Sequence, residues 1–170
     1  MGVEIEHKFL VSSEGWRADA DAGTAMCQGY LSLDPERTVR VRLAGERGTL
    51  TIKGRNRGAA RAEFEWSIPT DEAKELLDTL AIPPLVEKVR YRVPVGGHVF
   101  EVDVFSGRNA GLVVAEVELT AEGDAFERPG WLGAEVTGDG RYANAALVNS
   151  PYDTWSRSGA RDATLRGHDD

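Results

Sequence analysis

Charged and apolar residues alternate along several short segments of this chain. In the first, Glu4-Ile5-Glu6-His7-Lys8-Phe9, Glu4, Glu6 and Lys8 occupy every second position. Successive side chains of a β-strand point to opposite faces, so these three charges would share one face and Ile5 and Phe9 the other. The alternation returns at the following charged positions: Arg40 and Arg42, Lys53, Glu63 and Glu65, Lys88, Arg90 and Arg92, Glu101 and Asp103, and Glu116 and Glu118. We therefore expect many strands with one apolar and one charged face.

The alternating segments, together with the turn signals between them, predict about eight strands. Their expected ranges are 3–11, 28–33, 38–43, 48–53, 61–68, 86–93, 99–105 and 112–119. The connections are mostly short, and Gly96-Gly97 is typical of a tight hairpin. Hairpins join antiparallel strands, so the predicted fold class is mainly β (α+β): an eight-stranded antiparallel β-barrel, or tunnel, covered by a few helices.

One clear helix is predicted between the fifth and sixth strands, over residues 70–81. Thr70 is expected to be its N-cap, because a threonine hydroxyl can accept from a free N–H of the first turn. Leu76, Leu77 and Leu80 form an apolar stripe, and Pro83-Pro84 is expected to end the segment. This helix could cover part of the outer face of the barrel.

The C-terminal part of the chain has a different character. Residues 122–140, around Trp131, are expected to be loop-rich, and residues 142–149 a short helix. From residue 156 onward the chain is polar and is expected to be disordered. The length fits a single domain, which we place at residues 1–155 with a tail at 156–170.

Composition narrows the function classes. The formal charge of −8 argues against general nucleic-acid binding, which usually requires a basic surface. Cys27 is the only cysteine, so no internal disulfide can form, which fits a reducing compartment. The sequence begins without a signal-peptide pattern, and no apolar run is long enough for a membrane span. We expect a cytoplasmic protein without a membrane or nucleic-acid partner.

The charged faces could point outward into solvent or inward into the barrel. A single alternating strand is most often a half-buried strand with its charges in solvent. Here charges occupy consecutive same-side positions in strand after strand, which favours the inward orientation. Because buried ions must be paired or bound, carboxylates would suit Mg²⁺ or Mn²⁺, and arginines and lysines would suit phosphate oxygens. The combination is typical of metal-assisted phosphoryl transfer.

The segment Glu4-x-Glu6-x-Lys8 resembles the ExExK motif of the CYTH superfamily, also called triphosphate tunnel metalloenzymes. The resemblance covers nearly the whole predicted domain. Further similar segments are Gln28-Gly29-Tyr30-Leu31, Val39-Arg40-Val41-Arg42, Leu50-Thr51-Ile52-Lys53-Gly54, Glu63-Phe64-Glu65, Lys88-x-Arg90-Tyr91, Glu101-Val102-Asp103-Val104-Phe105 and Ala115-Glu116-Val117-Glu118-Leu119. Their order makes the match specific, although ExExK alone would be weak.

The resemblance implies a tunnel in which cationic residues bind a triphosphate and acidic residues bind Mg²⁺ or Mn²⁺. By position, the implied triphosphate ligands are Lys8, Arg40, Arg42, Lys53, Lys88 and Arg90. The implied metal ligands are Glu4, Glu6, Asp103, Glu116 and Glu118. The implied catalytic set is Glu4, Glu6, Lys8, Glu63, Glu65, Lys88 and Tyr30. Tyr30 matches a tyrosine that is thought to help hold the C-terminal helix, and His7 is expected to point outward.

The resemblance leaves several functions open. The leading expectation is metal-dependent hydrolysis of inorganic triphosphate to pyrophosphate and phosphate, as in the short bacterial members. The alternatives are a CyaB-like adenylate cyclase, a thiamine triphosphatase, or a non-catalytic protein that binds triphosphate or polyphosphate. Many members of the superfamily are dimers, so a homodimer is also open, although the sequence has no interface signature.

Overall fold

The computed structural model describes residues 2–155, and the predicted tail at 156–170 lies outside that range. The strands are β1 (Gly2–Val11), β2 (Thr24–Ser32), β3 (Thr38–Ala44), β4 (Arg47–Lys53), β5 (Ala60–Ile68), β6 (Ile82–Val95), β7 (His98–Phe105), β8 (Val113–Glu118) and β9 (Leu132–Glu135). Two α-helices accompany them: α1 (Thr70–Thr79) and α2 (Ala146–Asn149). No helix within the described residues is long and apolar enough to cross a membrane.

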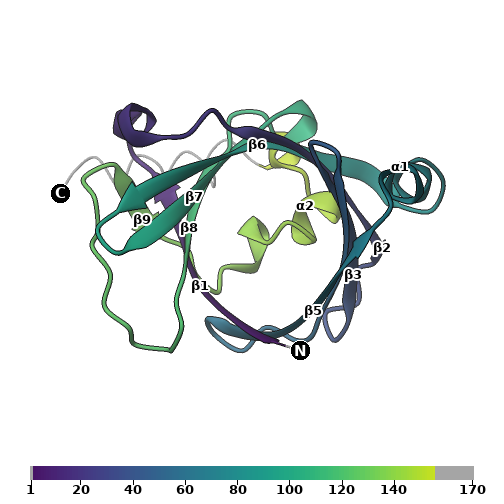
Figure 1. Cartoon of the computed structure of the whole chain (residues 1–170), viewed down its shortest axis with the longest axis horizontal. Helices are drawn as coiled ribbons and strands as arrows, with labels where there is room; N and C mark the ends of the chain where they lie inside the picture. Colours follow the sequence, from purple (N-terminus) through teal and green to yellow (C-terminus); the bar gives the residue numbers. More distant parts are fainter. Residues whose placement is uncertain (1, 156–170) are drawn as a thin grey trace.

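Eight of the strands close into the predicted antiparallel barrel (Figure 1). Around the ring the order is β1, β5, β4, β3, β2, β6, β7 and β8, and β8 pairs again with β1. Closure depends on β1, because its first half pairs with β5 and its second half with β8. The ninth strand, β9, adds to β1 at Phe9 and Val11, beyond the end of β5.

The apolar faces of the strands point out of the barrel, as predicted, and much of this outer surface is covered, although Val3 and Trp66 remain exposed. Helix α1 packs Ala73 and Leu77 on Val41 of β3. Elsewhere on the outer surface, Trp16 and Trp131 lie in one buried cluster with Phe9, Phe100 and Val102. Burial of these side chains removes apolar surface from water and leaves the other face of each strand for the interior.

The interior is charged only along part of its length. Leu10, Val86, Phe105 and Val114 continue the inward-facing positions of β1, β6, β7 and β8 beyond the last charge. These apolar side chains pack with α2, whose Leu147 is fully buried. In Figure 1, α2 and the segment before it lie within the outline of the ring. Residues 136–149, here called the C-terminal segment, therefore close one end of the barrel.

Three expectations about local structure were wrong, and one was incomplete. The region 122–140 is loop-rich as expected, but it also contains β9, a strand too short to be recognised by alternation. Residues 142–149 are not one helix, because a 3₁₀ turn at Gly140–Tyr142 precedes the shorter α2. Pro69 occupies the N-cap position of α1, and the Thr70 hydroxyl donates to the carbonyl of Glu46 instead. Strand β6 begins at Ile82 and includes Pro83-Pro84.

Candidate functional site

Two adjoining cavities, both open to solvent, occupy the charged part of the barrel. Both are lined by Glu4, Glu6, Arg40, Lys53 and Asn144. Between them they bring together Arg61, the predicted Tyr30 and twelve residues of the predicted charged faces: Glu4, Glu6, Lys8, Arg40, Arg42, Lys53, Glu63, Glu65, Arg90, Glu101, Glu116 and Glu118. The charged faces of seven strands thus meet around one interior space.

Arg40 on β3 is a central part of the cationic side. Its side chain is about nine-tenths buried, and its Nη2 donates to the Thr51 hydroxyl at 3.2 Å. Thr51 in turn donates to Glu65, at 2.9 Å. The Nε–H of Arg40 is buried without a hydrogen-bond partner among residues 2–155. A buried donor without an acceptor is costly, so this group suits an anionic ligand in the cavity.

Arg42 is oriented by a buried amide. Gln28 on β2 is fully buried, and its Oε1 accepts from Arg42 Nε at 2.9 Å. Burial and the nearby charges of Arg40 and Arg90 lower the pKa of Arg42 to about 10. Three guanidinium groups near one cavity repel one another, and a polyanion would relieve that repulsion.

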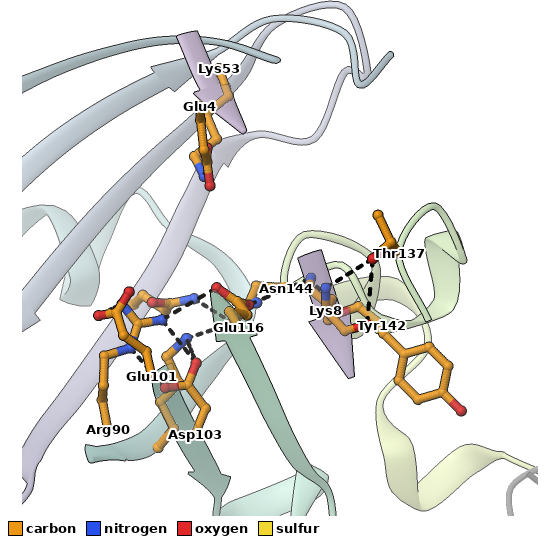
Figure 2. Close-up of polar contacts among 12 residues, drawn as sticks. Glu4, Lys8, Lys53, Arg90, Glu101, Asp103, Glu116, Thr137, Tyr142 and Asn144 are labelled. Atoms are coloured by element: carbon orange, nitrogen blue, oxygen red, sulfur yellow. Dashed lines mark hydrogen bonds and ion pairs between the residues drawn. The ribbon is translucent and has the colours of Figure 1, made fainter. Parts of the chain in front are cut away.

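Lys88 lies behind the cavity wall and is held by Asp103. Lys88 Nζ is 2.7 Å from Asp103 Oδ2, and Arg90 donates to both oxygens of Asp103 at 2.7 and 2.9 Å (Figure 2). Burial lowers the pKa of Lys88 to about 7, although Asp103 opposes the change. Both oxygens of Asp103 are used by these two cations. In this arrangement Asp103 holds Lys88 and Arg90 in place, and the metal-ligand role that the resemblance implies would require one of these contacts to be exchanged for the ion.

On the acidic side, neighbouring carboxyl groups and Lys53 shift one another's pKa values in opposite directions. Lys53 Nζ is 2.6 Å from Glu4 Oε2 and 3.6 Å from Glu63 Oε2. Burial alone would raise the pKa of Glu4, but hydrogen bonds from Glu6 and Glu63 and the Lys53 charge hold it well below its usual value. Burial and the negative charge of Glu4 raise the pKa of Glu63 to about 7. Burial, together with the nearby Glu116 and Glu4, also raises the pKa of Glu6 well above its usual value.

Strand register places further carboxylates directly opposite each other. Glu6 on β1 faces Glu118 on β8, and Glu116 on β8 faces Glu101 on β7. Like charges at opposed positions of a sheet are destabilising unless a cation lies between them. Such oxygen-rich clusters are the ligand type that Mg²⁺ and Mn²⁺ prefer.

The donor set therefore fits a divalent metal, although the side chains form no finished metal centre. Within residues 2–155, no three side chains of Asp, Glu, His or Cys meet in a metal-binding arrangement. The reason is visible in the ion pairs: Glu4 is turned toward Lys53, and Glu116 lies near Lys8 and Arg90. To bind a metal ion, these carboxylates would have to release their cationic partners, and any protonated carboxyl group would have to lose its proton.

Lys8 and Tyr30 connect the site to the C-terminal segment. Lys8 Nζ is 3.7 Å from Glu116 and donates to the carbonyl of Tyr142 at 3.3 Å (Figure 2). Tyr30 is buried in the same apolar cluster as Tyr142 and Leu147, in keeping with its predicted role beside the C-terminal helix. His7 lies on the outer side, where its Nδ1 is 3.1 Å from Glu135 of β9.

Three polar residues of the site were missing from the sequence-based set: Gln28, Thr51 and Asn144. Gln28 lies opposite Arg42 and Thr51 lies opposite Arg40, so both occupy inward-facing positions. The alternation of side chains along the strands could have revealed them. Asn144 lies in an irregular stretch between Tyr142 and α2. No periodic pattern marks it, and only the folded path of the chain brings it into the barrel.

The comparisons with known proteins agree with this architecture. An inorganic triphosphatase of Acetivibrio thermocellus is 47% identical over 152 residues, covering 89% of this chain and 97% of that protein. An inorganic triphosphatase of Nitrosomonas europaea is 37% identical and covers 87% of this chain and 98% of its own length. A crystal structure of an inorganic triphosphatase superposes with a TM-score of 0.62 at 35% identity, over 86% of this chain and 97% of the other. The CYTH domain pattern matches residues 2–143, and the chain therefore belongs to the CYTH domain family.

Proposed function

We propose that the protein hydrolyses inorganic triphosphate to pyrophosphate and phosphate with the help of Mg²⁺ or Mn²⁺. The observation that carries the proposal is the interior of the barrel, where Arg40, Arg42 and Arg90 face a cluster of carboxylates across one cavity. Arg40 offers a buried N–H with no acceptor among the described residues. The names of the two relatives, both inorganic triphosphatases, support the same reading.

The two sides of the cavity have separate roles in this proposal. Arg40, Arg42, Lys53 and Arg90 would bind the phosphoryl oxygens, with the guanidinium groups donating in pairs. Lys8 and Lys88 would add charge from the closed end. When bound, a divalent ion would neutralise charge on the phosphates and lower the pKa of the attacking water. Glu4, Glu6, Glu116 and Glu118 are the residues proposed to hold it.

A small substrate fits the closed end of the barrel better than a nucleotide does. The C-terminal segment fills the interior beyond Lys8 with apolar side chains such as Leu147. An adenosine or thiamine group would have to extend through the open end, where Glu65 and Glu118 are exposed. The filled interior leaves no room for such a group at the closed end, which favours inorganic triphosphate over the substrates of a cyclase or a thiamine triphosphatase.

The test is incubation of the purified protein with inorganic triphosphate, ATP or thiamine triphosphate, each with Mg²⁺, with Mn²⁺ or with a chelator. We expect metal-dependent release of phosphate, chiefly from inorganic triphosphate. Formation of cyclic AMP, or faster release of thiamine diphosphate, would replace the proposal with one of the alternative enzymes. Tight binding of triphosphate without turnover would identify a non-catalytic binding protein.

A further inference from the structure

Asn144 is a polar residue of the C-terminal segment whose side chain reaches into the charged part of the barrel. It lines both cavities, together with Arg40 and Glu6. Figure 2 draws it in the same cluster as Glu116, Arg90 and Asp103. The other inward side chains of the segment, such as Tyr142 and Leu147, belong to the apolar cluster that fills the closed end of the barrel, here called the plug. Asn144 is therefore where this segment offers the cavity a polar side chain within reach of the cationic residues.

The orientation of the Asn144 amide is fixed by two donors. Its Oδ1 accepts from Gln28 Nε2 at 2.8 Å and from Lys88 Nζ at 3.0 Å. A lysine ammonium can only donate, so the oxygen must face Lys88. Gln28 is fixed in the same way, because its own oxygen accepts from Arg42 Nε, which is also only a donor. The hydrogen bonds therefore all run in the same donor-to-acceptor direction, from Arg42 to Gln28 and from Gln28 to Asn144.

The fixed oxygen leaves the NH₂ group of Asn144 as a free donor. Within residues 2–155, Nδ2 makes no hydrogen bond, while the residue borders the cavity beside Arg42 and Arg90. An amide whose oxygen is bound, and whose NH₂ group has no partner among the described residues in a cavity that Arg42 and Arg90 also line, is suited to donate to an anionic oxygen of a ligand held by those cations.

We propose that Asn144 binds the substrate directly: its NH₂ group donates to a phosphoryl oxygen, while its oxygen holds Lys88 and Gln28 in place. The inference rests on the proposed triphosphate substrate and adds a ligand from outside the barrel strands. The same segment is fixed to β1 at two further points. Lys8 N donates to Thr137 Oγ1 at 2.9 Å, and Lys8 Nζ donates to the Tyr142 carbonyl. The C-terminal segment would accordingly be part of the binding site as well as its closure.

The test compares Asn144→Ala and Asn144→Asp with the wild type. Asn144→Asp keeps the shape and an oxygen for Lys88 and Gln28, but replaces the donor with a negative oxygen. Asn144→Ala removes the donor without adding charge. Loss of one hydrogen bond to a charged group predicts that KM for tripolyphosphate rises by about ten- to a hundredfold in both variants. The matched control is Asn149→Asp, which places the same charge at an exposed position of α2 and should leave KM unchanged.

Two further measurements separate direct binding from a structural effect. Thermal melting should show that Asn144→Asp remains folded, and this isosteric variant decides the question if Asn144→Ala is too unstable. In wild-type protein, the side-chain NH₂ signals that are absent from the ¹⁵N spectrum of Asn144→Asp should shift when tripolyphosphate is added. A lower kcat with unchanged KM, or NH₂ signals that do not move, would reduce Asn144 to a packing role and overturn the inference.

Failure of the Asn144 inference can be distinguished from failure of the proposed function. Calorimetric titration with tripolyphosphate in the presence of a chelator measures affinity without turnover. If the wild type binds tripolyphosphate but does not hydrolyse it, the proposed function fails, and the affinities of the variants still decide the role of Asn144. If the wild type hydrolyses it and the variants keep wild-type affinity, the inference fails alone. If the wild type does not bind tripolyphosphate, both fail.

Discussion

At the residue scale, the site is defined by how each charge is partnered. Lys53 and Lys88 are held by close carboxylates, whereas Arg40 keeps a buried N–H without an acceptor among the described residues. Because charges recur at every second position along each strand, the sequence was sufficient to predict that Arg40, Arg42 and Lys53 lie together. It could not show which carboxylate pairs with which cation, since that depends on the register between strands. Asp103 is the clearest case, because its place opposite Arg90 becomes visible only in the folded sheet.

Replacing Arg40 with alanine should weaken triphosphate binding. The guanidinium contributes charge-assisted hydrogen bonds, so its loss should raise KM for tripolyphosphate by about ten- to a hundredfold. Steady-state kinetics at saturating Mg²⁺ would measure the change. Lys74→Ala, which removes a positive charge from the exposed face of α1, serves as the control and should behave like the wild type. Similar KM values for the two variants would remove Arg40 from the binding site.

At the element scale, the C-terminal segment and β9 are the parts that the sequence concealed. Both are short: β9 has four residues and α2 has four. Elements of this length span only one or two periods of hydrophobicity, too few for a recognisable pattern, so their structure depends on tertiary packing. The apolar residues that continue the inward face, such as Leu10 and Phe105, indicate in retrospect that something apolar must fill that end of the barrel.

Truncation of Leu147 should test the closure of the barrel by α2. Leu147 is fully buried, so Leu147→Ala should lower the free energy of unfolding by about 2–5 kcal/mol. Urea unfolding would measure the loss. In Leu80→Ala the side chain removed is 64% exposed, and the change should stay within about 0.5 kcal/mol. Equal effects for the two variants would contradict the packing of α2 in the barrel.

The contact between β9 and β1 should make stability depend on pH through Glu135. Burial opposes the effect, but hydrogen bonds to His7 and Thr137 and the nearby Arg128 lower the pKa of Glu135. A carboxylate with a lowered pKa in the folded state stabilises the protein above its ordinary pKa of 4.5, and this contribution disappears as the pH falls through the folded-state value.

Urea unfolding at several pH values would compare the wild type with Glu135→Gln. We expect the wild type to be more stable at pH 7 and the difference to vanish in acid. A difference that is independent of pH would mean that the charge of Glu135 is not what matters.

At the scale of the whole molecule, the inward-facing side chains of the barrel are more polar than the outward-facing ones. The eight-stranded closure, the inward orientation of the charges and the covering by α1 and Trp131 were all predictable, because alternation and turn chemistry are local properties. The extent of the cavity was not, because the plug comes from a segment that is distant in sequence from the strands it meets.

Divalent metal should stabilise the whole barrel if the carboxylates bind it. A ligand that binds only the folded state raises stability, by about 2.7 kcal/mol at a hundredfold excess over Kd. We expect Mg²⁺ to raise the melting temperature, a chelator to reverse the shift, and NaCl of equal ionic strength to have no comparable effect. In Glu6→Gln, which removes one proposed ligand, the Mg²⁺-dependent shift should shrink. An undiminished shift in that variant would place the ion elsewhere.

The pairing of β1 has a consequence for the order of events during synthesis. Among the strands of the ring, β1, which carries Glu4, Glu6 and Lys8, is made first, yet residues 6–10 pair with β8, which is made last. Contacts between segments so far apart in sequence form slowly, because the intervening chain must first be brought together. The nascent chain therefore carries Phe9 without its partners on β7 and β8 until those strands have been made, and the charged pocket can be assembled only after β8 pairs with β1.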